Sequence, residues 1–325
     1  MLNRLLHHKI VAFAKLIRIE NLLMMVLTLW LLRSFVLQKL FLPNNISFSA
    51  NTNLYILLIT SVVLIAAAGY MINDYFDVKT DSINHPETVV LDKIIKRRWA
   101  IILHLSFTTA GILLGVFVAL KIGYLRLSLF HFISAFLLWF YSTRLKMKLL
   151  IGNIVVSLLT ASVAFIPLVF EIGILQKQQP QFIFEHAQLI LSALKITVIF
   201  SLFAFITSMA REIIKDIEDF NGDKASGGAT MPIVWGIRTS KFNAFFLLII
   251  TALLLSFALY NTIRFERKIM TFNNLYIALV LILPLLILSY SILVSHASIH
   301  FKRASLFLKL IMLAGLCYSL VYYFS

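Results

Sequence analysis

Two sets of three aspartates are the residues of this chain best suited to chemistry. They are Asp74, Asp77 and Asp81 in the first set, and Asp216, Asp219 and Asp223 in the second. Within each set the carboxylates are three and then four positions apart, so a helix places all three on one stripe. Like charges on one stripe repel each other, and a divalent cation is the natural neutraliser. The matched spacing therefore predicts a duplicated element that binds metal.

The types of candidate ligand indicate which metal. All of them offer oxygen, from the aspartates and from Asn73 beside the first set, and no His or Cys stands among them. Hard oxygen ligands favour Mg²⁺ over zinc or copper. Since Mg²⁺ is held by a few carboxylates together with substrate phosphates, two facing sets predict a diphosphate ligand between them. A merely solvated helix end is the alternative for one acidic cluster, but two clusters of identical spacing beside apolar segments argue against it.

Basic side chains near the two sets are candidate phosphate ligands, because a diphosphate keeps negative charge that the metal only partly neutralises. They lie in two long polar segments, 73–98 and 211–239, and in the short connection at 143–148. The candidates are Lys93, Arg97, Arg98, Arg144, Lys146, Lys215 and Lys224. For any one of them, a charge that only sets membrane topology is the alternative role.

The elements that must hold these residues are apolar helices. Of 325 residues, 61% are hydrophobic and 13% charged, and the mean hydropathy is +0.94, which excludes a water-soluble globule. Nine apolar windows are about 20 residues long, enough for a spanning helix and twice what a spanning strand needs. The windows are 16–38, 53–72, 99–120, 123–142, 147–171, 189–210, 240–262, 274–295 and 305–324. We predict an all-α integral membrane protein with about nine transmembrane helices.

The chain is expected to form a single membrane domain, 1–325, without a soluble domain between the spans. The two aspartate sets divide it into pseudo-repeated halves, 16–142 and 147–295, followed by a ninth span at 305–324. Basic residues are more frequent at the helix ends on the side of the N-terminus. This bias predicts that the N-terminus and both aspartate sets lie on the cytoplasmic side of the cell (inner) membrane. The basic group Arg264, Arg267 and Lys268 on the other side opposes this rule.

Charge and cysteine content exclude other classes. Lys and Arg number 29 against 14 Asp and Glu, a net charge of +15. In a polytopic membrane protein, excess basic residues set the orientation of the helices and contact anionic lipid headgroups. We therefore expect no nucleic-acid partner. The single cysteine, Cys317, excludes an intrachain disulfide, a four-cysteine zinc site and an iron-sulfur cluster.

Both aspartate segments resemble the signatures of a known family. Residues 73–81 (NDYFDVKTD) and 216–223 (DIEDFNGD) are similar to the first and second motifs of the UbiA superfamily of intramembrane prenyltransferases. Residues 18–21 (RIEN), 83–86 (INHP) and 141–144 (YSTR) are further matches. One departure is Ile19, which stands where the family usually has proline. The nine spans match the family architecture along essentially the whole chain.

The resemblance implies a central cavity in which two Mg²⁺ ions hold a prenyl diphosphate donor, with the aspartates catalytic. Its metal ligands correspond to Asn73 and Asp77 in the first motif and to Asp219 and Asp223 in the second, and Asp81 belongs to the same set by position. Arg18, Asn21 and Tyr141 would face the cavity. Asn153, early in the fifth span, either reaches the cavity or joins helices.

The identity of the prenyl acceptor is inferred from resemblance alone. The amino-acid sequence of residues 211–219, with 222–223 and 230–233, is most similar to that of the family branch that alkylates geranylgeranylglyceryl phosphate in ether-lipid synthesis. An aromatic acceptor of quinone synthesis, 4-hydroxybenzoate or dihydroxynaphthoate, is the second possibility. A non-catalytic isoprenoid-lipid binder or a transporter is the third. The expected partners are thus a prenyl diphosphate donor, a lipid or aromatic acceptor, and membrane lipids.

Overall fold

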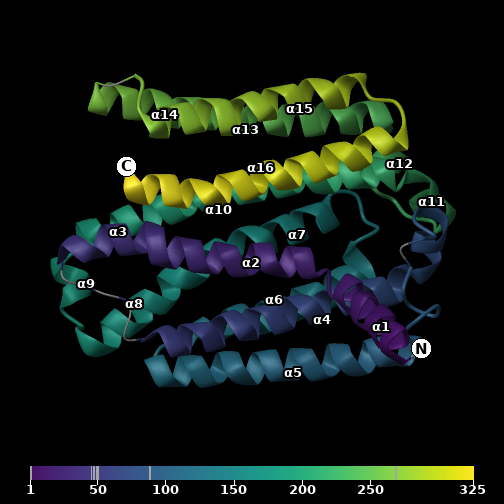
Figure 1. Ribbon diagram of the computed structural model, residues 1–325, viewed down its shortest axis with the longest axis horizontal. Coiled ribbons are helices and arrows are strands. Elements are labelled where there is room, and N and C mark those ends of the chain that lie inside the picture. The colour runs from purple at the N-terminus through teal and green to yellow at the C-terminus, as the bar shows by residue number, and fades with distance from the viewer. Residues whose placement is uncertain (1, 45, 47, 49–50, 88, 268) are drawn as a thin grey trace.

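The computed structural model describes residues 2–44, 46, 48, 51–87, 89–267 and 269–325, and this part of the chain folds almost entirely into helices (Figure 1). The α-helices are α1 (Leu2–Leu16), α2 (Ile19–Leu31), α3 (Gln38–Phe41), α4 (Thr52–Asn84), α5 (Arg97–Ile122), α6 (Arg126–Phe140), α7 (Ile151–Ser162), α8 (Ile166–Gln178), α9 (Phe182–Glu185), α10 (Ala187–Glu218), α11 (Phe220–Ala225), α12 (Met231–Val234), α13 (Ile237–Glu266), α14 (Phe272–Tyr276), α15 (Leu283–Val294) and α16 (Ser298–Phe324). Short π turns (Leu32–Leu37, Tyr141–Leu145 and Ile277–Ile282) and 3-10 turns (Leu42–Asn44 and Val163–Phe165) extend or join them.

Helix covers most of each of the nine windows predicted to span a membrane, although residues 147–150 form a turn before α7. Within the described residues, eight helices are long and apolar enough to cross a bilayer. The window 123–142 holds α6, which has 15 residues, carries polar side chains such as Arg126 and His131, and continues into the π turn Tyr141–Leu145. The prediction of an all-helical integral membrane protein is confirmed.

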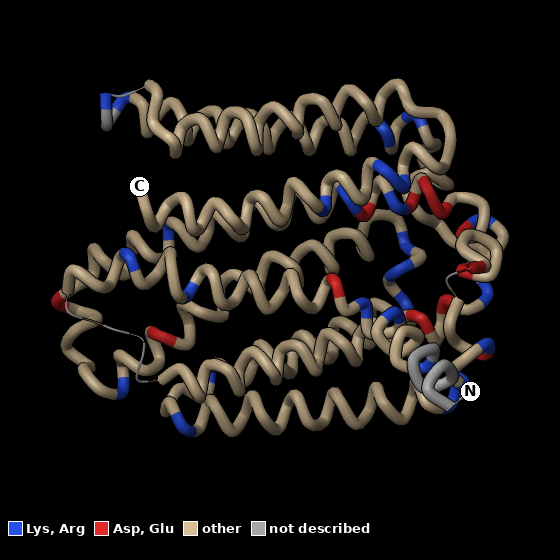
Figure 2. Tube along the Cα trace, in the orientation of Figure 1, with Lys and Arg blue, Asp and Glu red and all other residues tan. Residues whose placement is uncertain are grey.

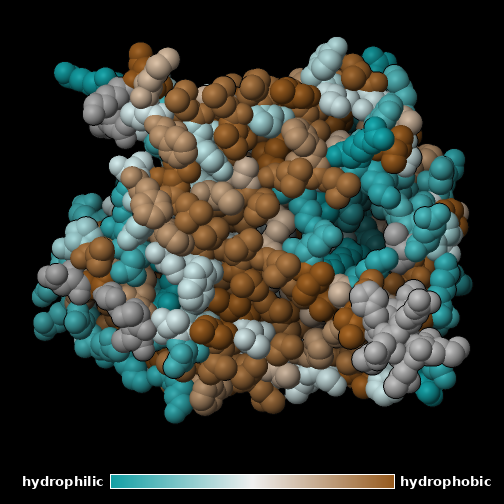
Figure 3. All heavy atoms as spheres, in the orientation of Figure 1, coloured by the Kyte–Doolittle hydropathy of each residue, from teal (hydrophilic) through white to brown (hydrophobic). Residues whose placement is uncertain are grey.

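The long helices run back and forth along one direction, and the two chain ends lie at opposite ends of the bundle (Figure 1). Large apolar side chains, among them Leu113, Phe136 and Phe257, are exposed on the outside of the bundle. On the face shown in Figure 3, hydrophobic side chains form a broad band across the middle of the molecule. In water such a surface would aggregate, whereas in a bilayer it is solvated by lipid chains.

The helices α4, α5 and α6 pack closely through small residues. Without a hydrophobic driving force between helices in lipid, close backbone approach supplies the packing energy. Gly115 of α5 faces α6, where a Cβ atom would lie only 2.4 Å from the His131 ring. That ring is itself fixed, because His131 Nε2 lies 2.8 Å from the hydroxyl of Ser61 on α4. Gly115 thus lets α4, α5 and α6 meet around one buried polar contact.

The two longest helices lead to the two aspartate motifs. α4 has 33 residues and carries the whole first motif at its C-terminal end, whereas α10 has 32 residues and carries only Asp216 of the second set. Asp219 follows α10 and Asp223 lies in α11, so the prediction of one helical stripe is wrong for the second set. Acidic residues gather at the end of the bundle where α11 and α12 lie, together with many basic residues (Figure 2). The fold therefore brings both motifs to one end of the bundle.

We expect Gly115→Ala to lower the thermal stability of the protein in detergent, because the added methyl group overlaps the His131 ring. Overpacking of this kind costs about 1–3 kcal/mol. The matched control is Ser106→Ala, at an exposed position of the same helix. An unchanged melting temperature for Gly115→Ala would contradict the close packing described here.

Candidate active site

A cavity of about 880 Å³ opens among α2, α4, α6, α7, α10 and α16. Five of the six aspartates line it, three of them from the second motif. They are Asp74, Asp81, Asp216, Asp219 and Asp223. The sixth, Asp77, is buried directly behind this lining, with 4% of its surface exposed. Both motifs therefore contribute to one hollow at one end of the bundle.

The first motif is held by partners from two other segments of the chain and by a contact within the motif. Arg18, just before α2, donates from Nη2 to Asp74 at 2.9 Å. Asp77 accepts a hydrogen bond of 2.6 Å from the amide of Asn73 and pairs with the ammonium group of Lys146. Burial lowers the pKa of Lys146, but the nearby Asp77 carboxylate outweighs it and raises that pKa above its ordinary value. Lys146 is therefore a fixed positive charge at the aspartate end of the cavity.

The second motif extends across the end of α10 into α11. Asp216, on the last turns of α10, accepts a 2.8 Å hydrogen bond from the amide of Asn153 on α7. Asp219 lies between the two helices, and its Oδ1 is 2.7 Å from Nε2 of His85. Asp223 is buried in α11. The three carboxylates thus lie in three different local environments despite their regular spacing.

Those environments separate the acidities of Asp219 and Asp223. Burial, reinforced by the charge of Asp219, raises the pKa of Asp223 to about 6. Burial acts in the same direction on Asp219, but the hydrogen bond from His85 and the charge of Lys215 hold its pKa below the ordinary value. The same hydrogen bond raises the pKa of His85. An added cation would stabilise both carboxylates in their charged forms.

Asn84, the last residue of α4, fastens the two motifs together. Its side-chain amide donates to the carbonyl oxygen of Asp219 at 2.9 Å and accepts from the backbone N–H of Gly222 at 2.8 Å. Position 222 requires glycine, since a Cβ atom there would lie 2.4 Å from the Asn84 amide nitrogen. A second link joins the hydroxyls of Thr80 and Ser226 at 2.8 Å. The ends of α4 and α11 are therefore fixed against each other.

A π turn directs Tyr141 and Lys146 into the same hollow. In a regular α-helix, residues five apart point about 140° away from each other. Here the N–H of Lys146 donates to the carbonyl oxygen of Tyr141, 3.0 Å away, closing a turn of five residues. Both side chains then line the cavity. This is a frequent use of π turns at functional sites.

The residues of the first motif fit a metal ion. The side-chain oxygen of Asn73 is buried and has no hydrogen-bond partner in the described part of the chain, while its amide group is engaged by Asp77. A buried oxygen without a partner is costly unless a ligand or ion satisfies it. Together with the carboxylates of Asp77 and Asp81 it forms an all-oxygen set of the kind that Mg²⁺ prefers.

A second group of possible ligands lies beside the second motif. One ligand atom from each of His85, Glu218 and Asp219 falls within 4.8 Å of the others. His85 follows the first motif in the chain, so this group also joins the two motifs.

The rest of the cavity is mostly apolar. It runs from the aspartates between α4, α6 and α8, along side chains such as Ile65, Phe130, Leu138, Val163 and Phe200. An apolar cavity of this kind can hold a hydrocarbon chain and keep water away from a reactive carbon. The site can therefore hold a molecule with an anionic head and an apolar tail.

The basic residues singled out by sequence separate into two groups. Lys146 and Lys215 line the cavity. Five others do not: Lys93 donates to the carbonyl of Pro86, Arg97 donates to the carbonyl of Tyr75, Arg144 and Lys224 lie over Phe140 and Phe220, and Arg98 is exposed. Arg18, Asn21, Tyr141 and Asn153 all line it.

Several residues of the site were not among those predicted from sequence. Asn84 and His85 belong to a matched segment, but nothing in the sequence indicated that they reach the second motif. The others are Glu20, Arg211, Glu212 and Lys309, which line the cavity on the side of α2, α10 and α16. Lys309 offered a signal, since an ionisable residue in the middle of an apolar span is a functional candidate by default.

Comparisons with known proteins agree in family and fold. The sequence pattern of the UbiA prenyltransferase family matches residues 35–313. Digeranylgeranylglyceryl phosphate synthase of Methanothermobacter thermautotrophicus is 33% identical over 198 residues, which are 60% of this chain and 62% of that protein. The chain thus matches less than two thirds of the length of this relative.

Two solved structures share the fold. A structure of digeranylgeranylglyceryl phosphate synthase gives a TM-score of 0.61 at 22% identity, covering 97% of this chain and 99% of the other. A UbiA homologue from Archaeoglobus fulgidus, bound to DMAPP and Mg²⁺, gives a TM-score of 0.52 at 15% identity, covering 95% and 99%.

We expect Lys146→Met to weaken the binding of magnesium pyrophosphate by about tenfold or more, the loss typical of one charge-assisted contact. Calorimetric titration of the detergent-solubilised protein measures this. Lys148→Met is the matched control, since Lys148 is exposed and does not line the cavity. Equal affinities for the two variants would rule out Lys146 as a phosphate ligand.

Proposed function

This chain belongs to the UbiA prenyltransferase family, and we propose that it transfers a geranylgeranyl group from its diphosphate to geranylgeranylglyceryl phosphate in a membrane. The observation that carries the proposal is the shared cavity of the two aspartate motifs, polar at one end and apolar along its length. The name of the Methanothermobacter relative supports the choice of acceptor. The product is an ether lipid with two isoprenoid chains.

We propose that the metal and diphosphate groups lie at the aspartate end. Asn73, Asp77 and Asp81 would hold Mg²⁺ on one side, and Asp219 and Asp223 on the other, giving two ions. Mg²⁺ bound there would neutralise negative charge on the departing diphosphate. The Mg²⁺-bound homologue of the same fold supports the choice of metal. Lys146 and Lys215 would contact the remaining diphosphate oxygens.

The reaction breaks the bond between C1 of the donor and its diphosphate oxygen, and the electron pair leaves with the diphosphate. A hydroxyl oxygen of the acceptor forms the new bond to C1, and its proton passes to the departing diphosphate or to water. The apolar part of the cavity beyond Tyr141 holds the donor chain and excludes water. Water would otherwise attack the allylic carbon and give the free alcohol. Asn153 fixes Asp216, and Asn84 fixes the turn at Asp219, so the carboxylates are positioned before the donor arrives.

We further propose that the aspartate end faces the cytoplasm in the cell membrane. Basic residues are concentrated at this end of the bundle (Figure 2), as the positive-inside rule requires. Both proposed substrates are membrane-associated, and their anionic heads would approach this end from the cytoplasmic leaflet.

We expect Asp77→Asn and Asp219→Asn each to reduce product formation about 100-fold or more, because each removes a charge that stabilises the reacting complex. The assay follows formation of digeranylgeranylglyceryl phosphate by mass spectrometry, with geranylgeranyl diphosphate, geranylgeranylglyceryl phosphate and Mg²⁺ in detergent. Asp92→Asn is the control, since Asp92 lies in the connection before α5, outside the cavity, and Asn tolerates its positive φ of 65°. Full activity of both motif variants would refute the proposal.

Removal of divalent metal tests the cofactor. We expect EDTA to abolish turnover and added Mg²⁺ to restore it, because without a cation the carboxylates repel the donor diphosphate. Turnover that survives complete chelation would contradict a magnesium-dependent reaction.

With 4-hydroxybenzoate in place of the lipid acceptor, we expect no prenylated product.

A further inference from the structure

The cavity opens sideways between α2 and α16. Hydrophilic side chains surround a hollow at this place in Figure 3, on the face of the molecule shown there. Glu20 of α2 and Lys309 of α16 both line the cavity, and the Glu20 side chain is 78% exposed. The opening thus has a charged rim within an otherwise apolar pair of helices.

Lys309 is an unusual residue for its position. α16 is an apolar helix of 27 residues, and Lys309 lies in its middle turns. Its Nζ donates to Oε2 of Glu20 at 2.8 Å, across the gap between α16 and α2. An ammonium group at this depth is costly unless it is paired or serves a ligand. Its partner is mostly exposed, so this pair is accessible to an incoming anion.

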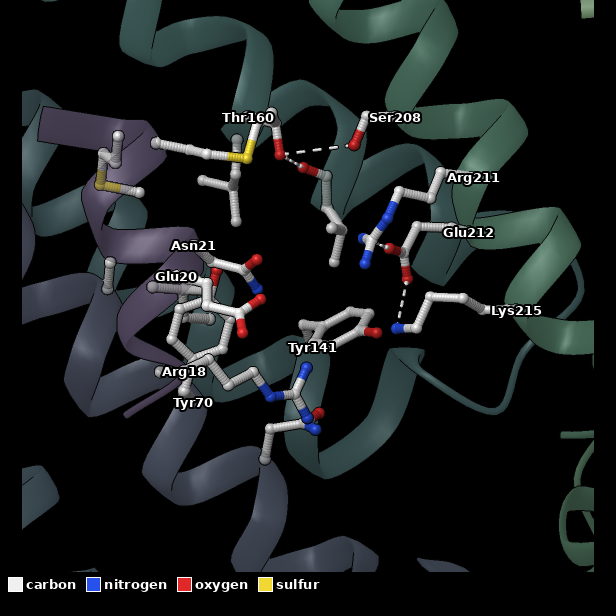
Figure 4. Close-up of a pocket in the computed structure, with 18 of the residues that line it drawn as sticks. Arg18, Glu20, Asn21, Tyr70, Tyr141, Thr160, Ser208, Arg211, Glu212 and Lys215 are labelled. Atoms are coloured by element: carbon white, nitrogen blue, oxygen red, sulfur yellow. Dashed lines mark hydrogen bonds and ion pairs between the residues drawn. The ribbon is translucent and has the colours of Figure 1, made fainter. Parts of the chain in front are cut away.

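Arg211 presents a second cation to the same space. Its Nη1 pairs with Glu212 at 3.2 Å, while its buried Nε has no partner in the described part of the chain. A guanidinium group has five N–H donors in a planar fork that matches phosphate oxygens. In Figure 4, Arg211 and Glu212 reach from α10 toward Glu20 and Asn21 on α2, with the ring of Tyr141 near them.

An apolar strip leads outward from these charges. It includes Met24 of α2, Leu32 of the π turn that follows α2, and Met312 and Leu316 of α16, all of which line the cavity. The strip suits the hydrocarbon chain of a molecule whose anionic head reaches the cations Arg211 and Lys309, which line the same cavity. Aromatic acids have a head of this charge type but no such chain.

We propose that Arg211 and Lys309 bind the phosphate of the lipid acceptor and so select a phosphomonoester acceptor. This inference rests on the proposed function. A phosphomonoester carries a charge of about −1.5 to −2 near neutral pH and three terminal oxygens, enough to engage both cations. Glu20 and Glu212 pair with these cations in the free protein, and the incoming phosphate takes their place. The donor diphosphate is bound separately, by the aspartate motifs and Lys146.

The test measures KM for donor and acceptor with Lys309→Met and Arg211→Met, in an uncharged detergent without anionic lipid. The two acceptors are geranylgeranylglyceryl phosphate and geranylgeranylglycerol, which lacks the phosphate. We expect each variant to raise KM for the phosphorylated acceptor about tenfold or more, as one lost charge-assisted contact predicts. KM for the donor and for the dephosphorylated acceptor should stay within about twofold of the wild-type values, because neither contacts these cations.

Controls separate the possible failures. Lys302→Met, an exposed position of the same helix, should leave all KM values unchanged, and Lys309→Arg should retain discrimination between the acceptors. Equal losses with both acceptors, or a raised KM for the donor, would overturn the phosphate assignment while leaving prenyl transfer intact. If the wild-type protein forms no product from either acceptor, the proposed function itself fails, and the acceptor site with it.

Discussion

Electrostatic repulsion among closely spaced carboxylates at a membrane boundary is the constraint on which the rest of this structure depends. Charges near hydrocarbon interact strongly because little water screens them. The protein limits this repulsion by giving most motif aspartates a partner from another segment: Arg18 for Asp74, Lys146 for Asp77, Asn153 for Asp216 and His85 for Asp219. These partners come from before α2, after α6, from α7 and after α4, so neutralising the carboxylates also ties the bundle together.

The same requirement explains the rigidity of the aspartate end. Asn84 joins α4 to the turn between α10 and α11 through both atoms of its amide group. A site whose polar groups are fixed before the ligand binds loses less free energy in reorganisation when charge develops. The apolar length of the cavity adds little to this preorganisation but determines which part of a substrate can enter. Head and tail of the proposed donor would thus be recognised by different physical properties of one cavity.

The charges along the opening between α2 and α16 follow a different logic. Glutamates pair with both cations in the free protein: Arg211 with the largely buried Glu212, and Lys309 with the mostly exposed Glu20. A pair with an exposed partner contributes little to stability, so the presence of Lys309 and Glu20 between apolar helices is better explained by ligand exchange. Two anion sites of different chemistry, one formed by Mg²⁺ that the carboxylates would hold and one by the cationic side chains Arg211 and Lys309, would let two anionic lipids bind together without competing for the same groups.

Composition and spacing were enough to predict the all-helical membrane fold, since hydrocarbon forces each span to satisfy its own backbone and gives apolar windows a fixed length. The repeated spacing likewise marked both motifs, because helical periodicity is local. Spacing alone did not predict that Asp77 would be buried behind the lining, or that Lys93, Arg97 and Lys224 would lie outside the cavity. Nor did it show that Asn84, His85 and Lys309 would lie near residues more than 100 positions away. Such contacts are set by how helices cross and where a π turn rotates a side chain, and these depend on packing between distant segments.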